Sequence, residues 1–212
     1  MKYSHIIWDW NGTLLDDAWL CVEVMNGMLK ARNLPLITIE KYRNVFSFPV
    51  KDYYLMLGFD FDAEPFEVVG MEFMDLYNIR QKECSLHDEV LENLTRVRSM
   101  GYRQSILSAR EENELRQEIM YMQVTEFFDH ICGLDDHYAH GKTDVGAKLL
   151  KEIGSPLEKI LFIGDTLHDA EVADELGIEC ILIPNGHQSF ERIKESGKRI
   201  INSLKELSEV IL

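Results

Sequence analysis

Short apolar runs alternate with amphipathic segments from about residue 104 to the end of the chain. The runs span residues 105–107, 130–132, 160–163 and 180–183. Hydrophobic residues recur at helical spacing between them, as at Val145, Leu149 and Ile153. Short apolar strands that alternate with helices are typical of a parallel sheet covered on both faces. The pattern therefore predicts an α/β fold built on a Rossmann-like parallel sheet.

A different pattern occupies the segment from about residue 17 to residue 83, which reads as almost wholly helical. Thr38 can cap one helix, Pro49 and Pro65 can each start another, and Gly58 can end one. An apolar run at residues 6–8 precedes this segment and reads as the first strand. We therefore predict a core domain of residues 1–16 and 84–212, with an inserted α-helical domain of residues 17–83.

The charge balance excludes several classes of partner. The chain has 22 basic and 37 acidic side chains among its 212 residues, a formal net charge of −15. Such a field repels nucleic acid, and no basic stripe offsets it. No apolar stretch approaches the ~20 residues that span a membrane. We expect neither a nucleic-acid nor a membrane partner, and an anionic ligand would need a metal ion or a local cationic site.

The cysteines and histidines give weaker indications. Four cysteines lie far apart without a CxxC pair, and no signal peptide is visible, so we expect reduced thiols in a cytoplasmic protein. His137 and His140 have the spacing of a metal pair, but no cysteine or acid completes a zinc site. We interpret them as surface loop histidines. The sequence leaves a monomer and a homodimer equally open.

Acidic residues follow two of the predicted strands. Asp9 follows the first, and Asp165 follows residues 160–163 with Asp169 four positions later. Ligands bind at the carboxyl edge of open α/β sheets, where these acids would meet. Two or three oxygen ligands with room for water suit Mg²⁺. Ser108 and Lys142, near the ends of other strands, could hold phosphate oxygens, and Ser108 could also cap a following helix.

The ordered motifs resemble those of a known family. Asp9-x-Asn11-Gly12-Thr13, then Ser108, then Lys142, then Gly164-Asp165-x-x-x-Asp169 resembles the four motifs of the haloacid dehalogenase superfamily. The helical insert is similar to the small cap of its phosphoglycolate phosphatase-like branch. The resemblance implies that Asp9 is a nucleophile that forms an aspartyl-phosphate. It also implies Mg²⁺ held by Asp9, the backbone carbonyl of Asn11 and Asp165, with Asp169 supporting the metal or its waters.

The resemblance also implies a phosphate site. Ser108 and the backbone amides of Gly12 and Ala109 would hold phosphoryl oxygens, with Thr13 in the same loop. Lys142 would keep Asp9 ionised, offset the phosphate charge and pair with Asp169. Apart from the resemblance, Arg110 follows Ser108 closely, so it could contact the substrate or equally form a surface salt bridge.

Asn11 departs from the family pattern, and Lys142-Thr143 departs where many relatives have Lys-Pro. Phosphatases of this family usually have Asp at the position of Asn11, acting as general acid and then as base. General acid–base help is worth about 10²–10⁴-fold, and an amide cannot supply it. Three explanations stay open: a slow phosphatase in which water or His168 moves the proton, a substrate with a good leaving group such as an acyl phosphate, or replacement of an original Asp. Dehalogenase and mutase chemistry are disfavoured.

We therefore predict a magnesium-dependent phosphatase that acts on a small phosphomonoester, with phosphoglycolate as the default by analogy. The alternative is a catalytically weak relative that binds phosphorylated metabolites or a protein partner. Several aromatic residues of the insert could belong to its core or line the site, and the sequence does not say which. They are Trp19, Phe46, Phe48, Tyr53 and Tyr54.

Overall fold

The computed structural model describes residues 2–134 and 141–211, so His137 and His140 lie outside the described residues. Its main sheet has six parallel strands in the order β5-β4-β1-β6-β7-β8. They are β1 (His5–Trp8), β4 (Arg103–Glu111), β5 (His130–Leu134), β6 (Ile160–Gly164), β7 (Glu179–Leu182) and β8 (Arg199–Ile200). The predicted α/β fold with a parallel sheet is confirmed.

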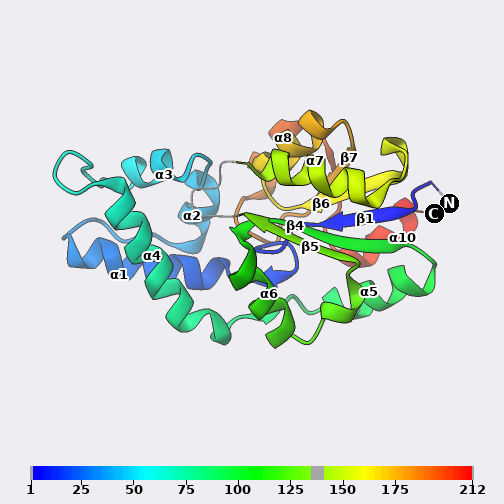
Figure 1. The fold of residues 1–212 in the computed structure, drawn as a ribbon. Coiled ribbons are helices and arrows are strands. Elements are labelled where there is room, and N and C mark those ends of the chain that lie inside the picture. Colours follow the sequence, from blue (N-terminus) through cyan, green and yellow to red (C-terminus); the bar gives the residue numbers. More distant parts are fainter. Residues whose placement is uncertain (1, 135–140, 212) are drawn as a thin grey trace.

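Helices cover both faces of this sheet (Figure 1). They are α5 (Val90–Ser99), α6 (Glu112–Tyr121), α7 (Lys142–Ile153), α8 (Leu167–Leu176), α9 (Phe190–Ile193) and α10 (Leu207–Ile211). Alternate residues of one strand enter opposite cores: Leu161 packs with the cluster that includes Leu94 of α5, and Phe162 with the cluster that includes Leu149 of α7. This burial on both faces explains why the strands read as continuous apolar runs.

The segment between β1 and β4 supplies the helical insertion, which extends beyond one end of the sheet, away from the chain termini (Figure 1). Its helices are α1 (Ala18–Ala31), α2 (Ile39–Val45), α3 (Val50–Met56) and α4 (Phe66–Arg80). Thr38 caps α2 by accepting a hydrogen bond from the Lys41 amide at 3.1 Å, and Pro49 and Pro65 immediately precede α3 and α4. These starts agree with the helix signals in the sequence.

A two-stranded antiparallel ladder, which the sequence analysis did not predict, closes the insertion. β2 (Leu15–Asp16) pairs with β3 (Ser85–Leu86), and Leu15 lies opposite Leu86. The ladder brings the two ends of the helical segment together beside the loop that follows β1. The exact division at residues 16/17 and 83/84 stays a prediction.

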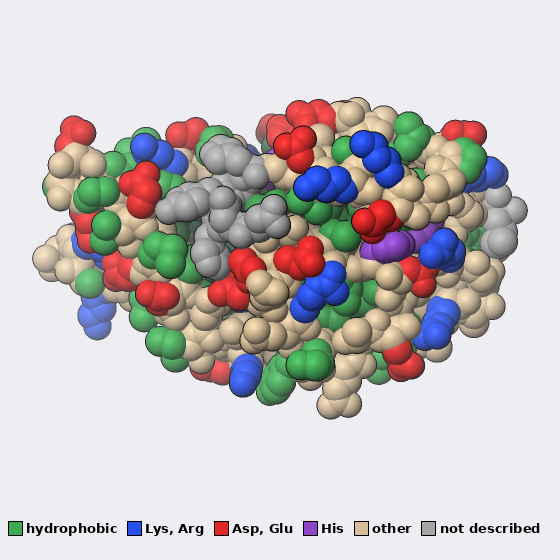
Figure 2. All heavy atoms as spheres, in the orientation of Figure 1, with side chains coloured by type: hydrophobic (Ala, Val, Ile, Leu, Met, Phe, Trp, Pro, Cys, Tyr) green, Lys and Arg blue, Asp and Glu red, His purple; other side chains and the backbone are tan. Residues whose placement is uncertain are grey.

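Short 3₁₀ helices complete the described elements: Gln81–Glu83, Thr125–Phe127, Leu157–Lys159, Lys194–Ser196 and Leu204–Glu206. In the part of the chain that the structure describes, no helix combines the length and apolarity that crossing a membrane requires. On the visible part of the face in Figure 2, Lys and Arg side chains are scattered among Asp and Glu side chains.

Candidate active site

Asp9 lies directly after β1, at the carboxyl edge of the sheet. Its backbone amide donates to the Ile163 carbonyl at 2.8 Å, so the β1–β6 pairing continues to this residue. The side chain is buried, and Oδ1 lies 2.6 Å from Nζ of Lys142. No described residue hydrogen-bonds to Oδ2 of Asp9, and Asp9 lines a pocket between the sheet and the helical insertion. One carboxylate oxygen is therefore held while the other can meet a ligand.

Lys142 is the first residue of α7 and is buried, not solvated. Its Nζ lies 2.6 Å from Asp9 Oδ1 and 2.7 Å from Asp169 Oδ1. Burial alone would lower the pKa of Lys142, but Asp169 and Asp9 hold that pKa above its ordinary value. The ammonium therefore stays charged between the two carboxylates.

Asp165 follows β6 and is clamped from two sides. Its Oδ1 accepts from Thr13 Oγ1 at 3.0 Å, and its Oδ2 accepts from the His187 amide at 2.6 Å. Gly12, with φ +76°, and Gly186 both approach this carboxylate so closely that a methyl group at either position would overlap Oδ2. Thr13, expected among the substrate-binding residues, thus uses its hydroxyl to orient Asp165.

Asp169 lies in the first turn of α8 and has both oxygens engaged. Oδ2 accepts from the Asp165 amide, the Thr166 amide and the Thr166 hydroxyl at 3.2, 3.0 and 2.7 Å, while Oδ1 faces Lys142. Thr166 and Asp169 together form a capping box. Burial raises the pKa of Asp169, but Lys142 and Thr166 outweigh it and the net shift is downward. Direct metal binding by Asp169 stays a prediction.

The three carboxylates form a compact set of oxygen donors. One oxygen each from Asp9, Asp165 and Asp169 lies within 4.8 Å of the others, and all three residues are buried. In the protein alone, burial raises the pKa of Asp9 to about 8 and that of Asp165 to about 6. Three carboxylates face one ammonium, so a hard divalent cation would fit both the charge and the donor type. Such a buried aspartate set is typical of a metal site.

Ser108 lies within β4, where the register with β5 shifts between Leu107 and Glu111. The prediction that Ser108 caps a helix is wrong, because the strand continues to Glu111 and the Glu111 side chain caps α6 by accepting from the Glu114 amide. Ser108 and Ala109 line the pocket, and Ser108 Oγ accepts from the Arg110 amide at 3.2 Å. The segment in which the strand pairing shifts therefore forms part of the pocket wall.

Arg110 is buried and joins the core to the insertion. Its Nη2 donates to Asn78 Oδ1 at 2.9 Å and Gln81 Oε1 at 2.6 Å, and its Nε lies 3.4 Å from Glu118 Oε2. The guanidinium also lies 5.1 Å from the ring centroid of Tyr77. The predicted salt bridge is present, but it is buried and not on the surface, and contact of Arg110 with a substrate stays a prediction.

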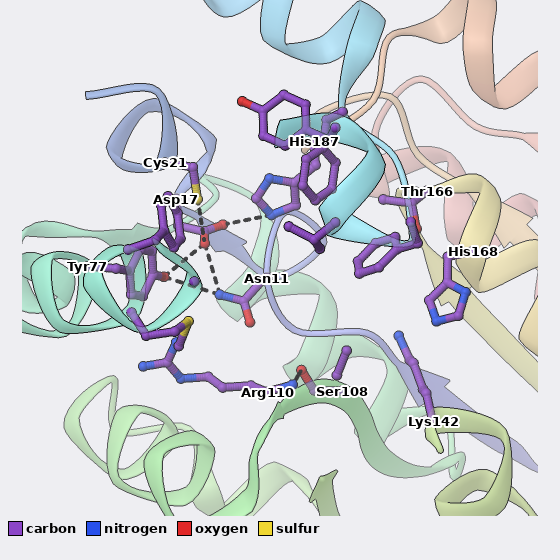
Figure 3. A pocket seen from close by; sticks show the side chains of 18 of the residues that line it. Asn11, Asp17, Cys21, Tyr77, Ser108, Arg110, Lys142, Thr166, His168 and His187 are labelled. Atoms are coloured by element: carbon purple, nitrogen blue, oxygen red, sulfur yellow. Dashed lines mark hydrogen bonds and ion pairs between the residues drawn. The ribbon is translucent and has the colours of Figure 1, made fainter. Parts of the chain in front are cut away.

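Asn11 belongs to a polar network around Asp17 (Figure 3). Asn11 Nδ2 donates to Asp17 Oδ2 at 2.9 Å and to the Tyr77 hydroxyl at 3.2 Å, and Tyr77 donates to the same oxygen at 2.8 Å. The Gly12 amide, expected to hold a phosphoryl oxygen, donates to Asp17 Oδ1 at 2.9 Å. The loop after β1 is therefore anchored to the first residues of the insertion.

His187 completes this network from a distant part of the chain. Its Nε2 lies 3.3 Å from Asp17 Oδ1, and its Nδ1 lies 2.8 Å from the Tyr42 hydroxyl. Although burial opposes both ionised forms, His187 lowers the pKa of Asp17 to about 2, and Asp17 raises the pKa of His187 to about 9. The two form a buried ion pair.

Sequence reasoning missed Asp17, Tyr77 and His187. His187 follows the apolar run at residues 180–183, so its place beyond a strand end was a usable signal. Asp17 and Tyr77 carry no motif. The sequence left five aromatic residues of the insertion without a place in either the core or the site. Trp19 does not line the pocket, whereas the other four do: Phe46, Phe48, Tyr53 and Tyr54.

Known proteins are similar to this chain in sequence. A family model described as haloacid dehalogenase-like hydrolase matches residues 6–183. An N-acetylmuramic acid 6-phosphate phosphatase of Pseudomonas putida is 24% identical over 193 residues, covering 88% of this chain and 85% of that protein. A phosphoglycolate phosphatase of Pseudomonas syringae pv. syringae is 26% identical over 142 residues, covering 65% and 52%.

Solved structures share the fold. A haloacid dehalogenase-like family protein of Streptococcus pneumoniae superposes with a TM-score of 0.85 at 20% sequence identity, covering 100% of this chain and 99% of that one. The agreement over the whole length includes the helical insertion between β1 and β4.

Proposed function

This chain belongs to the haloacid dehalogenase-like hydrolases, and on that premise we propose that it is a magnesium-dependent phosphatase of a small phosphomonoester that works through an aspartyl-phosphate. One observation carries the proposal. Asp9 is buried and lines the pocket, with Oδ1 fixed by Lys142, while no described residue hydrogen-bonds to Oδ2. A carboxylate held in this way is poised as a nucleophile.

In the proposed first step, Asp9 Oδ2 attacks phosphorus and the bond to the leaving-group oxygen breaks, with its electron pair departing on that oxygen. Water then attacks phosphorus of the acyl phosphate and the bond between phosphorus and Asp9 Oδ2 breaks. Asp9 leaves as a carboxylate, and the protons of the water pass to the phosphate and the solvent. Splitting one displacement into two lowers each barrier. Ser108 would hold a phosphoryl oxygen, supported by its burial in the pocket wall. Arg110 would stabilise the pocket by joining β4 to α4.

Asp9, Asp165 and the backbone carbonyl of Asn11 would hold Mg²⁺, which supplies charge neutralisation for the phosphate oxygens when bound. Lys142 and Mg²⁺ together would hold the Asp9 carboxylate in its ionised form, because with Lys142 alone the pKa of Asp9 stands at about 8, and Asp169 would position Lys142. The hydrogen bonds from Thr13 and His187 would keep Asp165 in one orientation. Removing hydrogen bonds that orient a metal ligand in this way commonly lowers metal affinity or activity by about 10–100-fold.

Proton transfer to the leaving group lacks its usual donor, because Asn11 is an amide. His168 lines the same pocket, and burial and Lys142 lower its pKa, which favours the neutral base over the acid. Efficient hydrolysis would then require a leaving group that departs without a proton. The absence of an acid at position 11 also supports the alternative function, which is a weakly active protein that binds phosphorylated metabolites.

The test compares Mg²⁺-dependent release of phosphate from acetyl phosphate and p-nitrophenyl phosphate. We expect turnover by the unmodified chain and its loss in Asp9→Ala. The matched control, Asp62→Ala, removes an exposed acid of the insertion and should leave turnover unchanged. Binding of phosphate esters without any Asp9-dependent turnover would instead support the binding protein.

A further inference from the structure

The pocket above Asp9 has a mainly aromatic lining contributed by the helical insertion. Side chains from α3, α4 and the segment between α2 and α3 take part, namely Phe46, Phe48, Tyr53, Tyr54, Phe66, Phe73 and Tyr77. Phe46 contacts two of the others edge to face: its ring centroid lies 5.4 Å from that of Phe48 and 5.4 Å from that of Tyr53. Such a wall offers flat apolar surfaces to a ligand.

This aromatic wall reaches the catalytic carboxylates. The Phe48 ring lies 4.6 Å from the His168 ring at an interplanar angle of 31°, and His168 directly precedes Asp169. On the other side, the Phe46 ring lies 5.4 Å from the ring of His187, whose amide holds Asp165. A leaving group attached to a phosphate at Asp9 would therefore extend into aromatic surroundings.

The cations that line this pocket already have anionic partners. Among the lining residues that the structure describes, Lys142 is held by Asp9 and Asp169, and Arg110 by Glu118. His187, raised in pKa, is paired with Asp17. The described lining also includes Glu67 and Glu111, which add negative charge. A carboxylate on the leaving group, as in phosphoglycolate, would lose its hydration without gaining an uncommitted cation there.

The amide at Asn11 points to the same kind of leaving group. A phenol has a pKa near 10, whereas water has one of about 15.7, so a phenolate departs with far less help from an acid than an alkoxide does. Loss of the proton donor is therefore much less costly for aryl esters than for alkyl esters. The aromatic wall and Asn11 are independent features, and both favour the same substrate class.

We propose that the preferred substrates are phosphate monoesters of neutral aromatic hydroxyl compounds, with the ring bound against Phe46 and Phe48. This proposal rests on the proposed phosphatase function. Asp9 takes the phosphoryl group, the bond between phosphorus and the aryl oxygen breaks, and the phenolate leaves with the electron pair and takes a proton from water.

The experiment measures kcat/KM with Mg²⁺ for phenyl phosphate, 4-carboxyphenyl phosphate and phosphoglycolate, with acetyl phosphate as a substrate too small to need the aromatic wall. The first two substrates share a ring and differ by one charge. We expect phenyl phosphate to exceed both carboxylated esters by about tenfold or more, the scale on which pocket contacts discriminate. Equal or better turnover of phosphoglycolate or 4-carboxyphenyl phosphate would overturn the proposal.

A pair of variants tests the wall itself. Phe48→Leu keeps an apolar side chain but removes the ring, and it should lower the ratio of phenyl phosphate to acetyl phosphate turnover by about fivefold to tenfold. Leu55→Ala, at a half-exposed position of α3 outside the pocket lining, should leave that ratio unchanged. An unchanged ratio in Phe48→Leu would contradict binding of the ring at this wall.

Turnover of acetyl phosphate distinguishes failure of the aryl-specificity proposal from failure of the proposed phosphatase function. If it is hydrolysed in an Asp9-dependent manner while the aryl preference is absent, the phosphatase function stands and the aromatic specificity is wrong. If no substrate, acetyl phosphate included, turns over, the phosphatase function fails and the specificity proposal fails with it.

Discussion

The side-chain amide of Asn11 donates a 2.9 Å hydrogen bond to Asp17 Oδ2, so the position that usually carries a catalytic acid is tied to an ionised carboxylate. His187 lowers the pKa of Asp17 to about 2, and Asp17 remains charged across the physiological range. An amide is well suited to this place because it donates a hydrogen bond without adding charge.

Asn11→Asp should change activity and stability in opposite directions. The new carboxyl group would face Asp17, so its pKa should rise and it should keep a proton to donate. We expect turnover of an alkyl phosphate to increase by about 10²-fold or more. The free energy of unfolding in metal-free buffer should fall, because two acids then share one site. Steady-state kinetics and urea denaturation measure the two effects, and alkyl phosphate turnover no faster than in the unmodified chain would contradict the prediction.

The ion pair of Asp17 and His187 should make stability depend on pH on the alkaline side. The pKa of His187 rises from 6.5 to about 9 on folding, so its stabilisation is complete below about pH 6.5 and is lost as pH rises through about 9. The contribution is on the order of 3 kcal/mol. Urea denaturation in magnesium-free buffer should show the difference between the unmodified chain and His187→Gln shrinking over this window.

The same measurement in an Asp17→Asn background isolates the cause. With Asp17 neutral, replacing His187 should no longer produce a pH-dependent difference between pH 6.5 and 9. A pH dependence that persists in this background would show that another group holds the proton.

Lys142→Met should destabilise the protein, with Mg²⁺ restoring part of the loss. Removing the ammonium leaves three buried carboxylates without their cation, and breaking a buried pair in this way costs about 3–5 kcal/mol. Methionine keeps most of the apolar stem, so lost packing is a minor contribution. We expect MgCl₂ to raise the urea midpoint of the variant more than that of the unmodified chain, and an equal shift in both would contradict this.

Gly186→Ala should weaken the response to Mg²⁺. A methyl group there would overlap Asp165 Oδ2 and the Gly12 carbonyl oxygen, so the carboxylate or the loop must move. We expect the Mg²⁺ concentration for half-maximal activity to rise by about tenfold or more. Gly27→Ala is the matched control, because that position in α1 has no neighbouring atom within 4 Å. The control should keep its Mg²⁺ response and gain about 0.5–1 kcal/mol of stability.

The sequence alone determined the sheet and the edge at which the site lies. The apolar runs near Leu107 and Phe162 are continuous because both faces of the sheet are covered, and that burial is recorded directly in the pattern of hydrophobic residues. Asp9 and Asp165 follow neighbouring parallel strands, so their convergence at one edge follows from the topology. Helix starts at Thr38 and Pro65 were readable for a similar local reason.

Tertiary structure decided which side chains meet. Ser108 precedes acids typical of a helix start, yet pairing with β5 extends the strand past it to Glu111. Asp17 and His187 lie 170 positions apart and carry no shared motif, and only the packing of the insertion against the loop after β7 makes them an ion pair. Periodicity records which face of a segment is buried, but the partners on that face come from distant segments, and no local pattern specifies them.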